Sequence, residues 1–294
     1  DPRSRNNPKS RAVEDARVRS TLREGGQSRA PIEFVHGPAG AVRRAVREMS
    51  GTSVFKAARA FTTTGPERPM KIKYCLELFA GSSRFAMAIG RLGYYVIAID
   101  IRFGEDHDLL SPKLRGAIMG WVQAKAIFAI LAGFICSSFS KARNMPGGPP
   151  PLRNSENVAG FPDLRPGDAK KVAMGNLFLR WCIKLLRACI VTRTVCVLEN
   201  PFTSWAWSMP EVASVRWLDA VEFWRTDFCQ WGTEWRKATG LLSAYLEYRP
   251  CSRVCTGRGI CSRTNRPHQI LKGQRADGVF WTLIAEPYPK IFCR

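Results

Sequence analysis

Hydrophobic residues along the chain form short blocks, and the spacing within each block predicts alternating strands and helices. Between residues 71 and 200, apolar runs of strand length are followed by segments whose apolar residues recur every three or four positions. The runs predict strands over 72–79, 94–99, 126–134 and 194–198, and the periodic segments predict helices over 85–92, 114–125 and 170–189. This alternation is typical of an α/β fold with a mostly parallel sheet.

The same pattern divides the chain into three parts. Residues 1–70 are poorer in apolar groups, and the first fifty carry eleven Lys or Arg against six acidic residues, so we expect a basic, partly disordered N-terminal arm. Residues 71–248 carry the strand and helix pattern and form the main domain. Residues 249–294 are rich in Cys and Arg, and we expect them to complete that domain.

The charge of the chain indicates a polyanionic partner. Lys and Arg number 45 and Asp and Glu number 24, which gives a formal net charge of +21. Nucleic acid is the first candidate. The longest apolar run, residues 126–136, is too short to span a bilayer, so no membrane partner is expected. Several of the ten Cys lie in apolar segments, which indicates reduced thiols and an intracellular protein, nuclear or cytoplasmic.

The turn after the first predicted strand has features of a site for a nucleoside cofactor. The segment Phe79-Ala80-Gly81-Ser82-Ser83 would allow close backbone approach, and Ser82 or Ser83 would cap the next helix. Asp100 follows Gly81 by nineteen residues and would offer a carboxylate to ribose hydroxyls. A dinucleotide is disfavoured because the full Gly-x-Gly-x-x-Gly pattern is missing. The alternative is an ordinary βα turn with a solvated Asp.

Two further loops follow predicted strands. Cys136-Ser137-Ser138-Phe139-Ser140 offers a thiol that could act as a nucleophile, although a structural Cys is the alternative. Glu199-Asn200-Pro201 stands at the end of the last predicted strand. Ligands gather at the carboxyl ends of the strands in open α/β sheets. We therefore expect the loops at Gly81, Cys136 and Glu199 to converge.

Together these motifs resemble those of the cytosine-C5 DNA methyltransferases, which use S-adenosylmethionine. Leu78-Phe79-Ala80-Gly81 is similar to the first motif of that family, and Glu199-Asn200-Pro201 to its Glu-Asn-Val motif. Cys136 is followed at three and four places by Phe and Ser, as in the family's nucleophile loop. The resemblance implies a Rossmann-like class I methyltransferase sandwich, S-adenosylmethionine as cofactor and DNA, or RNA, as partner.

The resemblance also implies a role for individual residues. Cys136 would add to C6 of a flipped cytosine, and Glu199 would hydrogen-bond the ring nitrogen and amine of that base. Arg236, with Gly232, corresponds to part of a further family motif and would be a third catalytic residue. The residues implied in cofactor binding are Phe79, Ala80, Gly81, Ser82, Ser83, Asp100, Asp108 and Asn200.

Departures from the family pattern leave two alternatives open. Ile135 stands where the family has Pro, Pro201 stands where it has Val, and the Gln of the Gly232 motif is missing. Asn200-Pro201-Phe202 partly resembles the Asn-Pro-Pro-Tyr motif of amino-group methyltransferases acting on DNA or RNA. The departures favour a second alternative, a decayed methyltransferase fold that only binds nucleic acid.

The C-terminal part contains a candidate metal site. Cys251, Cys255, Cys261 and His268 would supply four nitrogen and sulfur ligands, a set that suits a structural zinc ion. Reduced thiols in a basic loop are the alternative, since the spacings match no standard zinc finger. Seven Lys or Arg and no acidic residue lie between residues 249 and 275, so this loop would also contact phosphates.

Overall fold

The fold is organised around a six-stranded sheet. The computed structural model describes residues 74–144, 148–246 and 251–293, so the basic arm expected over residues 1–70 lies outside the described residues. The strand order is β2-β1-β3-β4-β6-β5. The strands are β1 (Tyr74–Leu78), β2 (Tyr95–Ile99), β3 (Ile127–Gly133), β4 (Val195–Pro201), β5 (Val221–Asp227) and β6 (Ala238–Ala244). The first four are parallel, and β6 runs antiparallel to both of its neighbours.

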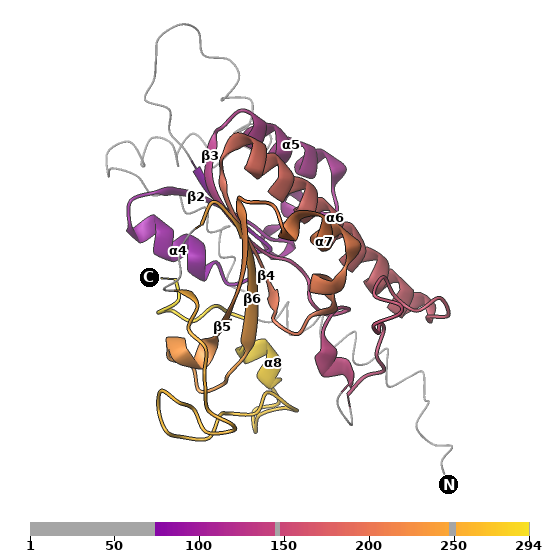
Figure 1. Cartoon of the computed structure of the whole chain (residues 1–294), viewed down its shortest axis with the longest axis vertical. Coiled ribbons are helices and arrows are strands. Elements are labelled where there is room, and N and C mark those ends of the chain that lie inside the picture. Colours follow the sequence, from indigo (N-terminus) through magenta and orange to yellow (C-terminus); the bar gives the residue numbers. More distant parts are fainter. Residues whose placement is uncertain (1–73, 145–147, 247–250, 294) are drawn as a thin grey trace, which may run out of the picture. The chain divides into compact units, whose positions relative to one another are not determined.

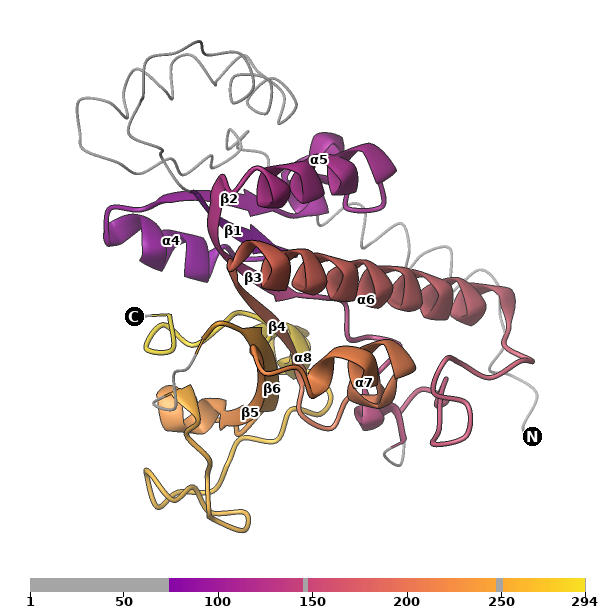
Figure 2. The same ribbon diagram turned by 45° about the horizontal axis from the view of Figure 1, so that its top comes forward.

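Helices cover both faces of the sheet (Figures 1 and 2). One face packs against α5 (Pro112–Gln123), α6 (Pro166–Thr192) and α7 (Pro210–Arg216), and this layer holds the main hydrophobic core. The other face carries α4 (Arg84–Arg91), where Ala86 packs on Cys75 and Val96. A sheet buried on both faces explains the nearly continuous apolar strands. In the described part of the chain, no helix combines the length and apolar character that a membrane span requires.

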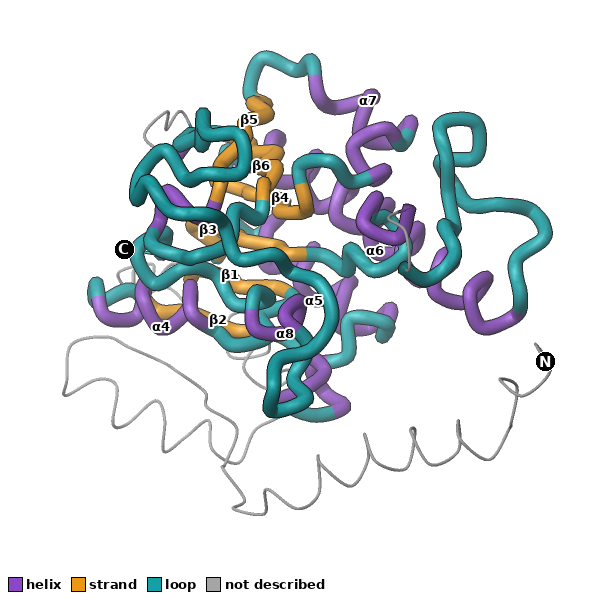
Figure 3. The backbone as a smooth tube through the Cα atoms, turned by 90° about the horizontal axis from the view of Figure 1, so that it is seen from below, coloured by secondary structure: helices purple, strands orange, loops and turns teal. Residues whose placement is uncertain are grey.

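The C-terminal segment returns to the sheet. It contains the short helix α8 (Trp281–Ile284), and Figure 3 shows this segment crossing the sheet on the side seen in that view. Several turns beside the strands are 3₁₀-helical, including η1 (Ile101–Phe103) after β2 and η5 (Phe228–Trp231) after β5. These turns and the C-terminal segment supply residues to both candidate sites.

The predicted α/β fold is confirmed, with two differences in its elements. The helix expected over 170–189 spans Pro166–Thr192, because Pro166 takes the first helical turn and Asp168 stabilises it at the N-terminus. The β5–β6 hairpin was not predicted. Of the helix predicted over 85–92, Ala86 is buried, whereas Leu92, the C-cap residue of α4, is 62% exposed.

The start of α4 is capped by a residue outside the helix. Ser83 occupies the N-cap position with a φ of 53°, and its side chain makes no capping hydrogen bond. Instead, the backbone N–H of Ala86 donates to Oε2 of Glu77 at 2.8 Å. Glu77 is buried in β1, and its Oε1 has no partner among the described residues. Burial raises the pKa of Glu77 to about 7, although the hydrogen bonds from Ala86 and Phe85 oppose the shift.

This buried carboxyl predicts a pH dependence of stability. Because the folded state holds the proton to a higher pH than the unfolded chain, stability is lost as the pH rises from about 4.5 to about 7, by about 3 kcal/mol. Glu77→Gln stays neutral, so its free energy of unfolding in urea should exceed the wild-type value at pH 8 and match it at pH 4. Glu222→Gln, on the exposed side of β5, is the control and should change neither value. Equal behaviour of the two variants would contradict the prediction.

Candidate functional site

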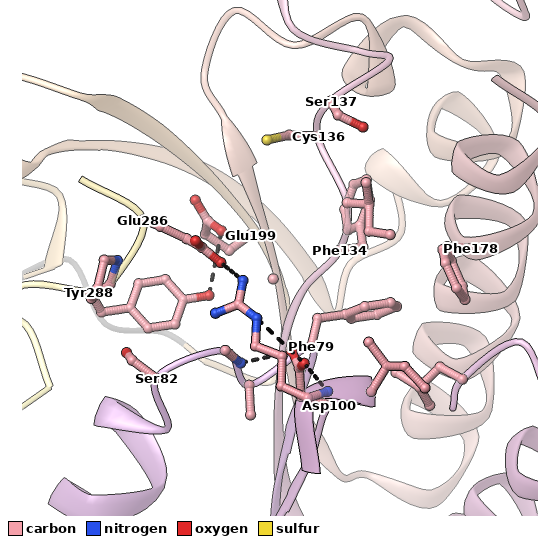
Figure 4. Close-up of a pocket in the computed structure, with 18 of the residues that line it drawn as sticks. Phe79, Ser82, Asp100, Phe134, Cys136, Ser137, Phe178, Glu199, Glu286 and Tyr288 are labelled. Carbon is pink, nitrogen blue, oxygen red and sulfur yellow. Dashed lines mark hydrogen bonds and ion pairs between the residues drawn. The ribbon is translucent and has the colours of Figure 1, made fainter. Parts of the chain in front are cut away.

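A cavity of about 620 Å³ lies where the carboxyl ends of the parallel strands meet. The three loops expected to converge do meet here, since Gly81, Cys136 and Glu199 all line it. Figure 4 shows Cys136 and Asp100 toward opposite ends, with Glu199 and Tyr288 along the wall between them. The C-terminal segment contributes to this wall with Leu283, Glu286, Pro287 and Tyr288.

One end of the cavity is built from the turn after β1. Phe79, Gly81 and Ser83 have φ values of 57°, 52° and 53°, so three alternate residues adopt the left-handed conformation. This turn brings the Gly81 N–H to Oδ2 of Asp100 at 2.8 Å, and the Arg102 N–H donates to Oδ1 at 2.9 Å. A carboxylate accepts about four hydrogen bonds, so Asp100 can accept more. Ser82 lines the cavity, whereas Ser83 does not.

The walls beside Asp100 are largely apolar. Phe79 packs edge-on against Phe178 with ring centroids 5.0 Å apart, and Ile101, Leu109 and Leu283 complete the surface. Asp108 also lines the cavity, with Oδ1 accepting the Leu110 N–H at 2.8 Å. This end therefore offers flat apolar surface next to carboxylate oxygens.

The other end carries a thiol. Cys136 is exposed at the cavity wall, and its sulfur points away from α6, toward the side on which Glu199 lies (Figure 4). The surrounding protein atoms raise the pKa of the Cys136 thiol, and the charge of Glu199 raises it further, while Lys237 lowers it. The thiol is thus reachable from the cavity and protonated at neutral pH.

Glu199 is a buried carboxyl with one oxygen that has no hydrogen-bond partner among the described residues. Its Oε2 accepts a hydrogen bond from the Tyr288 hydroxyl at 3.4 Å, and its Oε1 has no partner within the described ranges. Burial raises the pKa of Glu199, while Lys237 and the Tyr288 hydroxyl lower it. Buried polar atoms are nearly always hydrogen-bonded, and Oε1 is a buried, unpartnered atom of a residue that lines the cavity, so a side-chain rotation would offer it to a ligand group.

The structure places Lys237, and not Arg236, at the cavity. Arg236 pairs with Asp227 at 2.9 Å, donates to the Cys255 carbonyl and does not line the cavity, so the expected catalytic position of Arg236 is not observed. The next residue, Lys237, lines the cavity, and its Nζ donates to the Ala285 carbonyl at 3.0 Å. The buried Asp227 carboxylate is the reason, because it attracts the Arg236 guanidinium away from the cavity.

Asn200 also lies outside the cavity. Its Nδ2 donates to the Phe134 carbonyl at 2.8 Å, which ties the end of β4 to the loop after β3. The neighbouring Phe202 stacks on Phe223 with centroids 6.0 Å apart and is not a cavity residue. The expected contact of Asn200 with a cofactor is therefore not what this geometry provides.

A second cluster of chemical groups lies beyond the cavity. Cys229, Cys255, Cys261 and His268 place their ligand atoms within 4.8 Å of one another, an arrangement that could hold a metal ion such as zinc. Cys251 does not belong to the group, which corrects the ligand set expected from the sequence. Cys229 was missed because it belongs to η5, at the end of the hairpin that the hydrophobic pattern did not predict.

Other residues of the cavity were also missed by the sequence analysis. Arg102 pairs with Glu286, which joins η1 to the C-terminal segment. Pro287-Tyr288-Pro289 was the available signal for an ordered aromatic residue in that segment. The site thus combines a cavity within the usual size range of small-molecule sites with a thiol at one end and a buried carboxyl along one wall. No model of a known protein family matches the chain, and a search of curated proteins also gives no match.

Proposed function

We propose that the protein is an S-adenosylmethionine-dependent DNA methyltransferase that acts on C5 of cytosine. The observation that carries the proposal is the joint placement of Cys136 and Glu199 in a cavity whose other end holds the Gly81–Asp100 contact. These are the three motifs that resemble the family, and they come from the ends of three different strands. The parallel sheet alone brings these loops together, so the support comes from the groups that they place in the cavity: a thiol, a buried carboxyl and an Asp held by the Gly81 N–H.

The residues around Asp100 fit the proposed cofactor. The free acceptor positions of Asp100 suit ribose hydroxyls, and the surface of Phe79, Ile101 and Leu109 suits an adenine ring. The cavity volume of about 620 Å³ lies within the usual range for small-molecule sites. S-adenosylmethionine supplies an electrophilic methyl group when it is bound.

The other end fits the activation of cytosine. Cys136, which is exposed, would give its proton to water and bond through Sγ to C6. The displaced C5–C6 π electrons would then leave C5 electron-rich enough to accept a methyl group. Glu199 would donate from its protonated oxygen to the ring nitrogen and accept from the amine, and both contacts favour attack at C6. Transfer of the C5 proton to water would re-form the C5–C6 double bond and break the Sγ–C6 bond, and the released thiolate would take up a proton again. Lys237 favours the thiolate because its charge lowers the pKa of Cys136.

Two broader features support the class of enzyme and of partner. The mostly parallel sheet with helices on both faces is compatible with the Rossmann-like class I methyltransferase sandwich that the motifs imply. The net charge of +21 favours binding to the phosphates of DNA. The Cys₃His cluster, for which zinc is the proposed ion, lies outside the cavity lining and supplies no reacting group for methyl transfer.

The geometry favours this chemistry over amino-group methylation. That alternative requires Asn200 and Phe202 at the target base, yet Asn200 is held by the Phe134 carbonyl and Phe202 by Phe223. A decayed fold that only binds nucleic acid would bind DNA without transferring a methyl group. Transfer of labelled methyl from S-adenosylmethionine to cytosine-containing duplex DNA distinguishes an active methyltransferase from a decayed fold that only binds DNA.

Binding of the cofactor is tested by calorimetry with the full chain. Asp100→Ala should weaken S-adenosylmethionine binding by about 10- to 100-fold, because it removes hydrogen bonds to a charged acceptor. Asp106→Ala is the matched control, since Asp106 is exposed on the same loop and does not line the cavity. Thermal unfolding of each variant checks that the fold is intact. Absence of binding to the wild-type protein at millimolar cofactor would remove the proposal.

A further inference from the structure

The ligand atoms of the Cys₃His cluster lie close enough together to surround one tetrahedral metal ion. Cys229, Cys255 and Cys261 are 0%, 1% and 3% exposed and form a small buried cluster of their own. Sγ of Cys255 lies 3.6 Å from Nε2 of His268, and the usual zinc bond lengths predict about 3.6 Å for that edge of a tetrahedron. The remaining ligand atoms need only small side-chain movements, since all lie within 4.8 Å of one another.

Groups around the cluster orient its ligands. Nδ1 of His268 lies 3.2 Å from the Gly259 carbonyl, which can only accept, so Nδ1 carries the proton and Nε2 keeps a lone pair toward Cys255. Nε2 of Gln230 donates to Sγ of Cys229 at 3.5 Å, and the Ser262 N–H donates to Sγ of Cys255 at 3.4 Å. Donors aimed at sulfur stabilise thiolates, the form that binds metal.

The loop that carries three of the ligands has little regular secondary structure and little apolar core of its own, although hydrogen bonds such as Cys261 N–H to the Arg266 carbonyl and Asp227 N–H to the Arg253 carbonyl fasten its turns. Within residues 251–280, the structure contains two isolated bridges, Ile260 with Pro267 and Gln274 with Phe280. The buried residues in that range are Cys255 and Cys261, both of them ligands. A disulfide would join two of the three thiols and leave the third unused. A bound metal would give this exposed, basic loop the buried anchor that its two turns and hydrogen bonds do not supply.

We propose that Cys229, Cys255, Cys261 and His268 bind one structural zinc ion, which holds the C-terminal wall of the cavity in place through η5. Three thiolates and one imidazole are a donor set typical of structural zinc, and four protein ligands leave no open position for catalysis. Cys229 belongs to η5, whereas the other ligands belong to the loop that leads into the C-terminal segment. The ion therefore joins the hairpin end to that loop.

Contacts of η5 lead from the cluster to the cavity. Phe228 and Trp231, on either side of Cys229, pack against Phe292 with centroids 5.7 and 5.3 Å apart, and Phe228 also packs against Tyr288 at 6.4 Å. The Tyr288 hydroxyl in turn donates to Glu199. The metal would thus help to position Glu199, and the use of Glu199 to bind a base rests on the proposed function. The metal site itself and its contact with the C-terminal segment do not depend on that function.

The ligand set is tested by elemental analysis of the full chain purified without added chelator. The wild-type protein should contain about one zinc per chain, and Cys229→Ser and Cys255→Ser should lose most of it. Cys251→Ser is the matched control and should keep its zinc, because Cys251 lies outside the cluster. A wild-type protein without zinc that also fails to bind added zinc would overturn the site. Retention of zinc by Cys229→Ser would overturn the ligand set.

A measurement on the wild-type chain avoids variants that fail to fold. Replacement of zinc by cobalt should give thiolate-to-metal absorption, and its absence would count against thiolate coordination. Removal of zinc by a chelator should speed hydrogen exchange over residues 228–231 and 281–292 while leaving β1 and β2 unchanged. Unchanged exchange in the C-terminal segment would overturn its dependence on the metal. Failure of the zinc-loaded protein to bind S-adenosylmethionine would remove the proposed function alone.

Discussion

Cys136→Ala is expected to abolish methyl transfer to cytosine while leaving S-adenosylmethionine binding at the wild-type level. The variant removes the sulfur that must bond to C6, and without that bond C5 stays too poor a nucleophile to accept the methyl group. Loss of a covalent nucleophile should lower the rate by at least about 10³-fold. Transfer of labelled methyl to duplex DNA measures the rate, and calorimetry measures cofactor affinity.

A covalent adduct with a modified base tests the role of Cys136 as the nucleophile directly. Duplex DNA containing 5-fluorocytosine should form a stable adduct with the wild-type protein, because fluorine cannot leave in the elimination step, and Cys136→Ala should form none. Cys251→Ser should form the adduct normally, because Cys251 does not line the cavity. Wild-type methylation by Cys136→Ala would exclude Cys136 as the nucleophile and return attention to amino-group chemistry.

The parts of the fold that the sequence predicted are those built from local patterns. Apolar runs and helical spacing identified β1, β2, β3 and β4 with α4, α5 and α6 between them, since each element buries its own regular set of side chains. The β5–β6 hairpin was not predicted, because its two strands are separated by η5 and a turn and give no short hairpin signal. Its strands alternate less clearly, with β5 exposing Glu222 and partly burying the next three residues.

The candidate site shows the same division between local and distant contacts. The loops at Gly81, Cys136 and Glu199 follow directly from strand ends, and their convergence was predicted from the parallel sheet. The C-terminal wall was not, because Tyr288 reaches Glu199 across 89 residues and Glu286 reaches Arg102 across 184. The spacing of apolar residues carries no information about contacts between residues so far apart in the chain. Three of the four metal ligands were found by spacing, and Cys229 was not, because it comes from the unpredicted hairpin end.

The loop that carries Cys136 depends on a buried arginine that the sequence analysis did not select. Arg153 is 1% exposed, and it donates to the Ser138 carbonyl and hydroxyl, to the Val158 and Val172 carbonyls and to Asn176 Oδ1. Its guanidinium carbon also lies 3.8 Å from the centre of the Phe139 ring. No carboxylate pairs with it in the described part of the chain. Burial lowers the pKa of Arg153 to about 10, which still leaves it charged at neutral pH.

Arg153 therefore holds the two residues that lie two and three places after Cys136. A close approach of this loop to α6 is possible because Gly175 has no side chain, since a Cβ there would lie 2.6 Å from the Ser138 hydroxyl. Backbone carbonyls and an amide oxygen surround the guanidinium and replace the water that it has lost. Without the arginine, these acceptors would remain buried and unpartnered, which costs about 1–3 kcal/mol for each.

Arg153→Met is expected to lower the free energy of unfolding by about 3 kcal/mol or more, because methionine fills similar space but donates no hydrogen bond. Arg180→Met is the matched control. Arg180 is 56% exposed and pairs with Glu211 at 2.7 Å, and an exposed ion pair contributes at most about 1 kcal/mol. Urea unfolding at pH 7 compares the two variants, and modification of Cys136 by a thiol reagent under native conditions reports on the loop. Equal losses of stability would show that the acceptors around Arg153 find other donors, and unchanged Cys136 reactivity in Arg153→Met would show that Arg153 does not position the loop.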